Sequence, residues 1–128
     1  KACPMFVPLV ENGYIDSPAT YIIAEEYLKP LLDDNIDTII LGCTHYPLLR
    51  KVISDIIGKG VTIIDAGYET ALYTKQHLME NGLLSDRKTA GEIQYFVSDD
   101  VEKFSYLGGA FLDRAINSKV EKINIEGE

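Results

Sequence analysis

The stretch that decides the fold is Ile39-Ile40-Leu41-Gly42-Cys43-Thr44-His45-Tyr46-Pro47-Leu48-Leu49, an apolar run that passes directly into a short polar motif. We predict a buried strand over 37–41 and a helix over 48–57, which Gly58-Lys59-Gly60 ends. In open α/β sheets, ligands bind beyond the carboxyl ends of the strands, where the next helix directs free amide N–H groups outward. The thiol of Cys43 and the imidazole of His45 are therefore expected to face a ligand crevice.

Strand and helix patterns alternate along the rest of the chain. Ser17-Pro18 is typical of a helix N-cap followed by proline, whereas residues 5–10 carry Pro8 and fit either an edge strand or a loop. Asp99 and Glu102 match a capping box at the start of a helix. This order predicts an α/β fold with a parallel sheet. The further expected elements are a helix over 18–33 that Pro30 kinks in its last turn, a strand over 61–64, a helix over 69–80, a linker over 85–91, a strand over 93–97, a helix over 99–115 and an edge strand over 119–125.

The composition favours a globular chain with a real core. Of 128 residues, 46% are apolar and 25% charged, and the net charge of -8 disfavours a nucleic-acid partner. No apolar stretch approaches the roughly 20 residues that a membrane helix requires, so we expect no membrane partner and a cytoplasmic protein. The chain opens on Lys1 and runs into apolar sequence, which suggests a piece of a longer protein.

The two cysteines have different surroundings. Cys43 precedes a predicted helix, whose N-terminus stabilises a thiolate, although a small core residue is the alternative interpretation. Cys3, beside Pro4, has no such helix and is interpreted as structural, and no disulfide between the two is expected. No metal site is expected either, because Cys43 and His45 supply only two ligands and Cys3 and His77 would have to converge on them. His77 is instead expected on a solvated helix face.

Four residues extend the candidate site around Cys43. In an extended chain His45 points the same way as Cys43, where an imidazole orients a substrate or exchanges protons, unless it is a capped or surface histidine. Thr44 offers a hydroxyl and a backbone N–H suited to a ligand carboxylate, unless it is an ordinary helix N-cap. Gly42 allows close backbone approach. Glu11 is expected either to hydrogen-bond His45 or to be a solvated loop acid.

The run Gly42-Cys43-Thr44-His45-Tyr46-Pro47-Leu48 resembles the bacterial glutamate racemase family, within the cofactor-independent aspartate/glutamate racemases. Upstream, Ala2-Cys3-Pro4-Met5-Phe6-Val7-Pro8-Leu9-Val10-Glu11 resembles the family's Cys-Pro-Leu-Phe-Val-Pro-Leu-Val-Glu segment. Downstream, Ile64-Asp65-Ala66-Gly67-Tyr68-Glu69-Thr70-Ala71 is similar to a family segment that usually has serine in place of Ala66.

The resemblance covers the C-terminal half of such an enzyme. It implies a parallel-sheet, three-layer α/β/α fold in two similar domains with the active site between them. Residues 1–66 would belong to the second domain, and residues 67–128 would complete the first. The first catalytic cysteine and the N-terminal substrate-binding segments are missing, so the fragment alone is expected to be inactive and to need the missing N-terminal half. Exposed sheet edges also favour a homodimer.

The resemblance implies chemistry without a cofactor or a metal. Racemising glutamate requires removal of a weakly acidic Cα proton and return of a proton on the opposite face, which takes one group on either side. Carried over from the family, Cys43 acts on L-glutamate, His45 assists it, Thr44 and Gly42 bind the substrate, and Glu11 is an auxiliary partner of His45. The product, D-glutamate, would supply peptidoglycan synthesis.

Three other functions fit the same residues. A racemase for aspartate or a related acid differs only in how the side-chain length is recognised. A cysteine hydrolase would use Cys43 as nucleophile and His45 as base, and would leave no solvent hydrogen at Cα. A flavodoxin-like interaction module would use Cys43 only as a core residue.

Overall fold

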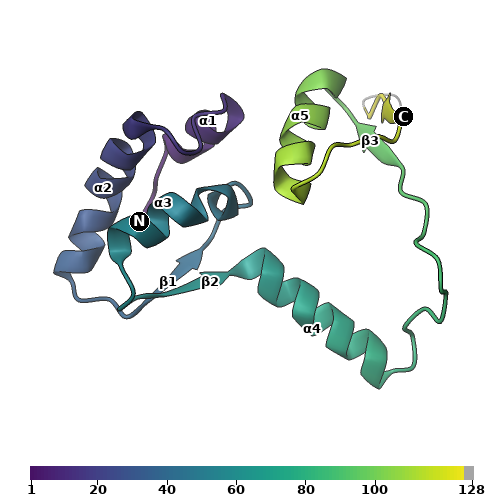
Figure 1. Cartoon of the computed structure of the whole chain (residues 1–128), viewed down its shortest axis with the longest axis horizontal. Helices are drawn as coiled ribbons and strands as arrows, with labels where there is room; N and C mark the ends of the chain where they lie inside the picture. The colour runs from purple at the N-terminus through teal and green to yellow at the C-terminus, as the bar shows by residue number, and fades with distance from the viewer. Residues whose placement is uncertain (126–128) are drawn as a thin grey trace. The chain divides into compact units, whose positions relative to one another are not determined.

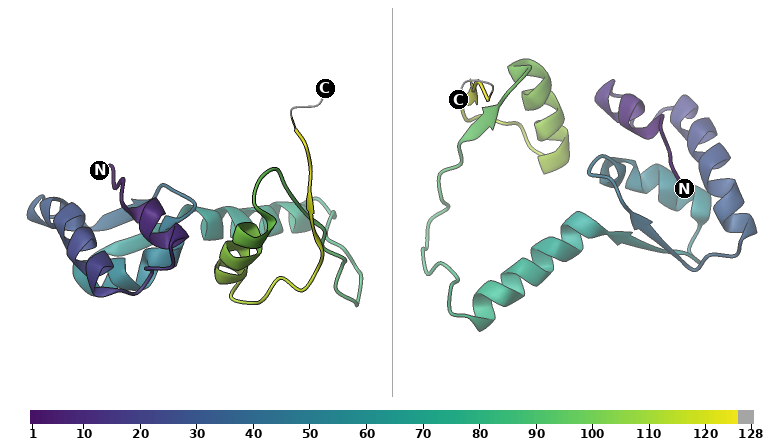
Figure 2. Two further views of the ribbon diagram at one scale, coloured as in Figure 1. Left: turned by 90° about the horizontal axis from the view of Figure 1, so that it is seen from above. Right: turned by 180° about the vertical axis from the view of Figure 1, so that it is seen from behind.

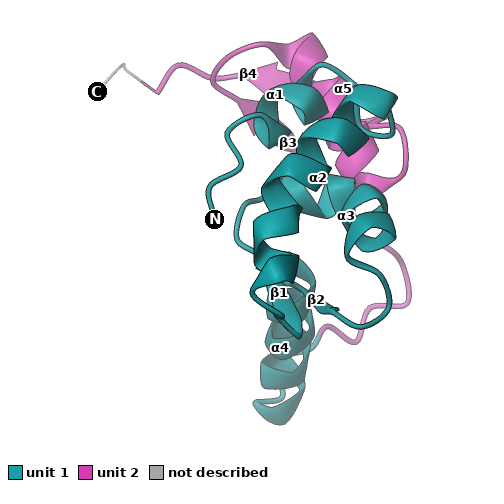
Figure 3. Cartoon of the chain, turned by 90° about the vertical axis from the view of Figure 1, so that its left-hand side faces the viewer, with its two compact units in different colours: residues 1–84 teal, residues 85–128 magenta. Residues whose placement is uncertain are grey.

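The computed structural model describes residues 1–125, which fall in two compact units. The first unit is Lys1–Leu84 and the second is Ser85–Glu128, drawn in different colours in Figure 3. Each unit holds one pair of parallel strands. The predicted α/β class with parallel strands is therefore confirmed.

The first unit is built around a strand–helix–strand segment (Figure 1). Strands β1 (Thr38–Leu41) and β2 (Thr62–Asp65) pair in parallel, with Leu41 opposite Asp65. Between them the chain forms the 3-10 helix η1 (Tyr46–Leu49) and helix α3 (Arg50–Ile57), while α1 (Phe6–Glu11) and α2 (Pro18–Asp33) precede β1 and α4 (Ala66–Glu80) follows β2. Because the strands are parallel, both carboxyl ends lie at one edge of the sheet.

Helix α2 has the predicted bounds, and local chemistry explains them. The Ser17 hydroxyl oxygen accepts a hydrogen bond from the Thr20 N–H at 3.3 Å, and Pro18 takes the first helical position. Pro30 stays inside the helix, which continues to Asp33. Both views of Figure 2 show α2 beside α3, and their packing forms much of the unit's interior.

Residues 6–11 form a helix, so the edge strand or loop expected over 5–10 is wrong. Pro8 is the third residue of α1, and the backbone N–H groups of a first helical turn have no acceptor within the helix. A proline there removes no hydrogen bond. The ring of Phe6 packs edge-on against Tyr27 and Tyr46, with centroids 5.4 and 5.2 Å away. Burial of these aromatic rings holds α1 against α2 and η1.

The core of the first unit lies on one face of the β1–β2 pair. Ile39 and Leu41 of β1 face the helices, whereas Ile40, on the opposite face, is 63% exposed. Helices therefore pack against one face of the β1–β2 pair in the described part of this unit, and not against both faces as the three-layer prediction required. The buried cluster consists of Cys3, Phe6, Val10, Ala24, Leu28, Leu41, Leu49, Val52, Ile53 and Ile57.

The second unit contains β3 (Tyr95–Val97), α5 (Val101–Leu112) and β4 (Val120–Lys122), and β3 pairs with β4 in parallel. These elements are shorter than the sequence suggested. Asp100, not Asp99, caps α5, since its Oδ1 accepts from the Lys103 N–H at 2.8 Å. The capping box was therefore placed one residue early. Residues 85–91 contain no helix or strand, as expected of a linker.

The fully buried residues of the described chain all lie in its first part. Among the described residues, none after Ile57 is fully buried. Helix α4 buries no residue, and its Tyr68 and Tyr73 are 61% and 70% exposed. In the described part of the chain, every helix is too short or too polar to span a membrane.

Candidate active site

The predicted motif forms the loop that connects β1 to the next helical turn. Gly42 leaves the strand, and a Cβ atom added there would meet no atom within 4 Å. The Tyr46 N–H donates to the Cys43 carbonyl oxygen at 3.1 Å and closes a turn beneath the motif. Pro47 is the second residue of η1, where its missing N–H costs nothing. The sheet edge and this turn together fix the motif's backbone.

The helix predicted over 48–57 is a 3-10 turn over 46–49 followed by an α-helix over 50–57. The N-cap of η1 is His45, without a side-chain cap, and α3 starts only at Arg50. The interpretation of Thr44 as an ordinary N-cap is therefore wrong. His45 has φ −83° and ψ −25°, a helical conformation, so the side-chain direction expected of an extended chain does not apply.

The His45 imidazole links two elements of the site. Its Nδ1 lies 3.3 Å from the Thr44 hydroxyl oxygen, and its Nε2 lies 3.4 Å from Glu11 Oε1. Glu11 is the last residue of α1, so the corrected helix is what brings this carboxylate to the motif. The side chains of His45 and Glu11 are 23% and 32% exposed. Glu11 and His45 are thus close to each other, as expected. The alternative, in which Glu11 is a solvated loop residue, does not apply.

The two thiols are both free and lie in different environments. Cys43 is half-buried in the loop beyond β1, whereas Cys3 is 7% exposed within the core cluster. Burial raises the pKa of the Cys3 thiol. Cys3 is thus buried in the core, as a structural residue would be, and Cys43 is the more exposed of the two thiols.

Tyr46 is a residue of the site that the sequence did not single out. Its hydroxyl donates to the Cys3 carbonyl oxygen at 3.5 Å, and its ring packs against Phe6. Burial raises the pKa of Tyr46, and the neighbouring thiols of Cys3 and Cys43 raise it further. The phenol therefore stays neutral and ties the motif to the segment before α1. The only sequence signal that could have identified Tyr46 as part of the site was its position directly after His45.

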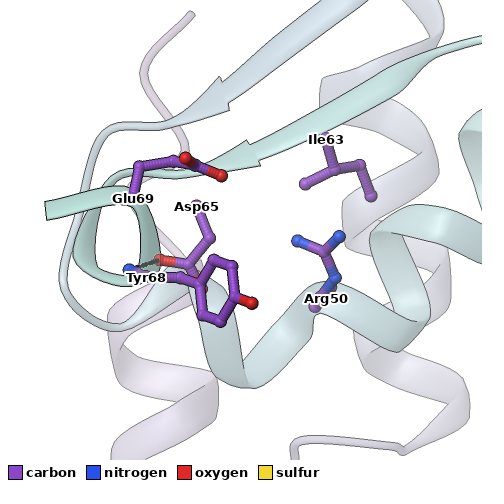
Figure 4. Close-up of a pocket in the computed structure, with 5 residues that line it drawn as sticks. All are labelled: Arg50, Ile63, Asp65, Tyr68 and Glu69. Atoms are coloured by element: carbon purple, nitrogen blue, oxygen red, sulfur yellow. Dashed lines mark hydrogen bonds between the residues drawn. The ribbon is translucent and has the colours of Figure 1, made fainter. Parts of the chain in front are cut away.

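A pocket of about 420 Å³ opens beyond the end of β2 (Figure 4). Its lining comes from α3, β2 and the first turn of α4, and Figure 4 shows the Arg50 guanidinium directed into it. Asp65 Oδ1 caps α4 by accepting from the Gly67 and Tyr68 N–H groups at 3.0 and 3.1 Å. None of the predicted site residues lines this pocket. The lining residues are Arg50, Ile63, Asp65, Tyr68 and Glu69.

His77 lies on α4, exposed and stacked on Tyr73 with ring centroids 6.1 Å apart. It is a solvated helix residue, as expected. Within residues 1–125, no group of three or more His, Cys, Asp or Glu side chains is arranged to hold a metal ion.

No family model matches the chain. Among curated proteins, the glutamate racemase of Chlorobaculum parvum is 48% identical over 112 residues, which are 88% of this chain and 41% of that protein. The glutamate racemase of Geobacter metallireducens is 39% identical over 128 residues, covering 100% of this chain and 47% of the relative. The chain therefore spans less than half the length of these relatives.

Solved structures give the same result for the fold. A glutamate racemase isoform from Bacillus anthracis matches with a TM-score of 0.87 and 33% identity, over 99% of this chain and 47% of that one. The glutamate racemase of Francisella tularensis, solved with D-glutamate, matches with a TM-score of 0.83 and 32% identity, over 98% and 47% of the two chains.

Proposed function

Because this chain is related in sequence and in fold to about half of a glutamate racemase, we propose that it is the Cys43-bearing half of a cofactor-independent glutamate racemase that interconverts L- and D-glutamate. The observation that carries the proposal is the half-buried free thiol of Cys43 beyond the end of β1, in the same loop as Thr44 and His45. Cysteine serves as a base when it is a thiolate, and this position is open to a ligand.

The reaction requires a second proton-transferring group. A base removes the Cα proton from one face, and an acid returns a proton to the opposite face of the resulting carbanion. Cys43 supplies one face. Cys3 cannot supply the other, because it is 7% exposed in the core. The second group therefore comes from polypeptide outside this chain, and the chain alone is inactive.

The residues of the motif divide the remaining work. Cys43 takes the proton from L-glutamate and gives one back in the reverse direction. His45, held beside Glu11, assists the thiol, since an imidazole exchanges protons and, when protonated, stabilises a nearby thiolate. Thr44 and Gly42, both exposed, bind the substrate.

The missing part of the enzyme is also the proposed structural partner. Residues 1–66 form part of one domain, and residues 67–128 complete the other. The exposure of α4 (Ala66–Glu80), which buries no residue, supports this division, whereas the compact unit that carries β1 and β2 extends beyond it to Leu84. The assembled enzyme is a cytoplasmic homodimer whose D-glutamate is used for peptidoglycan, the cell wall and cell shape.

A chimera tests the activity. The 112 residues of the Chlorobaculum parvum racemase that match this chain are replaced by it, and deuterium wash-in at Cα of L- and D-glutamate is followed in D₂O. We expect exchange in the chimera and none in the chain alone. Aspartate is tested in parallel. Exchange with aspartate but not with glutamate would show that the substrate is aspartate.

Two substitutions at the cysteines provide the control. Cys43→Ser should abolish exchange, whereas Cys3→Ala should keep it, because Cys3 only fills the core. Exchange that survives Cys43→Ser would remove Cys43 from the mechanism. A folded chimera that exchanges neither amino acid would overturn the racemase proposal.

A further inference from the structure

The pocket beyond β2 carries opposite charges in its lining. The guanidinium of Arg50, the first residue of α3, is directed into it, and the carboxylate of Glu69, in the first turn of α4, lies on the other side (Figure 4). Ile63 and the 61% exposed ring of Tyr68 add apolar surface. The volume of about 420 Å³ is within the range of about 300 to 1,000 Å³ that small-molecule sites span.

The chain itself neutralises neither charge. Within residues 1–125, the side chains of Arg50 and Glu69 form no hydrogen bond or ion pair, with each other or with a third group. Asp65 differs, because its Oδ1 accepts hydrogen bonds from two N–H groups of α4. The pocket therefore offers a ligand one guanidinium and one carboxylate that the described residues leave unpaired.

These groups specify the charges of a ligand. A guanidinium pairs best with a carboxylate, through two parallel N–H···O bonds. A carboxylate binds an ammonium group, and the face of a tyrosine ring attracts the same cation. A ligand that is only an anion is disfavoured, because the lining holds the two carboxylates of Asp65 and Glu69 against the single guanidinium of Arg50. A molecule with both charges matches the pocket.

We propose that the pocket beyond β2 binds a small zwitterion, with the ligand's carboxylate on Arg50 and its ammonium group between Glu69 and the Tyr68 ring. Free α-amino acids and ω-amino acids are compounds of this class. The pocket shares no residue with the loop after β1 that carries Cys43. The proposal therefore does not rest on the proposed racemase function.

Nitrogen-15 NMR of the 128-residue chain locates the ligand. The amides of Gly67 and Tyr68 report on the pocket, because both donate to Asp65, whereas those of Gly42 and Thr44 report on the loop after β1. Glycine, γ-aminobutyrate and 6-aminohexanoate are the probes, since the distance between their charges increases in that order. We expect at least one to shift both pocket amides, with a dissociation constant of about 1 to 10 mM for so few atoms. No saturable shift, or shifts confined to the loop, would overturn the proposal.

Analogues with one charge test the two contacts separately. For the probe that binds best, the acid without its amine and the amine without its acid are titrated under the same conditions. Each should bind at least about 10-fold more weakly, because it loses one charge-assisted hydrogen-bonded contact. If the acid alone or inorganic phosphate bound as tightly as the zwitterion, the pocket would be an anion site and the proposal would be wrong.

Matched substitutions test the two residues. Arg50→Gln and Glu69→Gln should each weaken binding about 10-fold, and both side chains are exposed, so the fold should be kept. The controls are Arg87→Gln in the linker and Glu26→Gln on the exposed surface of α2, which should bind as the wild type does. Far-UV circular dichroism confirms folding of each variant. Unchanged binding in both pocket variants would refute the assignment.

The chimera tests whether the pocket stays open in a longer chain. We expect the zwitterion to shift the same two amides there. Loss of these shifts in a folded chimera would show that other polypeptide fills the pocket, and would overturn the proposal of a ligand site. A chimera that binds the zwitterion but exchanges no proton at Cα would refute the proposed function and leave this site intact.

Discussion

Replacing Phe6 by alanine should destabilise the first unit and release the Glu11 end of the site. Phe6 is 1% exposed, and it is the residue through which α1 contacts the rings of Tyr27 and Tyr46. Glu11 lies on the same helix, and His45 immediately precedes Tyr46. Loss of this ring therefore acts on stability and on site geometry together.

The size of the effect follows from two contributions. Truncation of a fully buried phenylalanine costs about 3 to 5 kcal/mol of unfolding free energy, because apolar contacts are lost and a cavity remains. The two edge-to-face pairs account for about 0.5 to 1.5 kcal/mol each beyond area burial. Phe6→Leu keeps most of the burial and loses the pairs, so it should cost about 1 to 3 kcal/mol.

Equilibrium urea unfolding followed by far-UV circular dichroism measures these values. Tyr14→Ala is the control, since Tyr14 is an aromatic residue of the same unit that is 55% exposed, and it should stay within about 0.5 kcal/mol of the wild type. If Phe6→Ala were no more destabilising than Tyr14→Ala, α1 would not be packed as described. Placement of Glu11 beside His45 would then lose its physical basis.

A thiol reagent should modify Cys43 in the native chain and Cys3 only after denaturation, because burial protects Cys3 and raises its pKa; two fast thiols would contradict the core assignment. Gly58→Ala should lower the free energy of unfolding by about 1 to 3 kcal/mol, since φ is +73° there, whereas Gly60→Ala should have little effect; equal urea midpoints would refute this. The pKa of Asp55 is lowered by its hydrogen bonds to a tyrosine of α2 and a lysine of α3, so its contribution is present above the ordinary carboxyl pKa of about 3.9 and is lost as pH falls through its lower folded value. Acid titration of stability should therefore show the Asp55→Asn difference shrinking at low pH, and a constant difference would contradict the assignment.

The sequence predicted the elements whose signals are local. Ser17-Pro18 located the start of α2, because a side-chain cap and a proline in the first turn depend only on neighbouring residues. The apolar run that includes Ile39 and Leu41 located β1 and, with it, the loop that carries Cys43. The site's position at a strand end follows from parallel topology, which the alternation of elements indicated.

The features that were missed depend on contacts between distant segments. Pro8 and its β-branched neighbours resemble an edge strand, and only packing of Phe6 against α2 and η1 favours the helix. The pocket that includes Arg50 and Asp65 joins α3, β2 and α4, and no local pattern predicts that meeting. The shift of the α5 cap from Asp99 to Asp100 is a choice between two adjacent acceptors, which sequence spacing alone does not resolve.

One absent partner accounts for both the chemical and the structural incompleteness of the chain under the proposed function. Cys43 lacks a second proton-transferring group on the other face of a substrate, and Cys3 is too deeply buried to provide it. The described residues after Ile57 include large apolar side chains but none that is fully buried, and they contain an exposed α4. A polypeptide that packed against α4 would contact the same compact unit that carries Cys43, which is what supplying the missing group requires. Addition of that partner should therefore raise the chain's unfolding free energy under the same conditions in which exchange at Cα begins, because binding to the folded form stabilises it. If activity arose without stabilisation, the apolar surface would have another role.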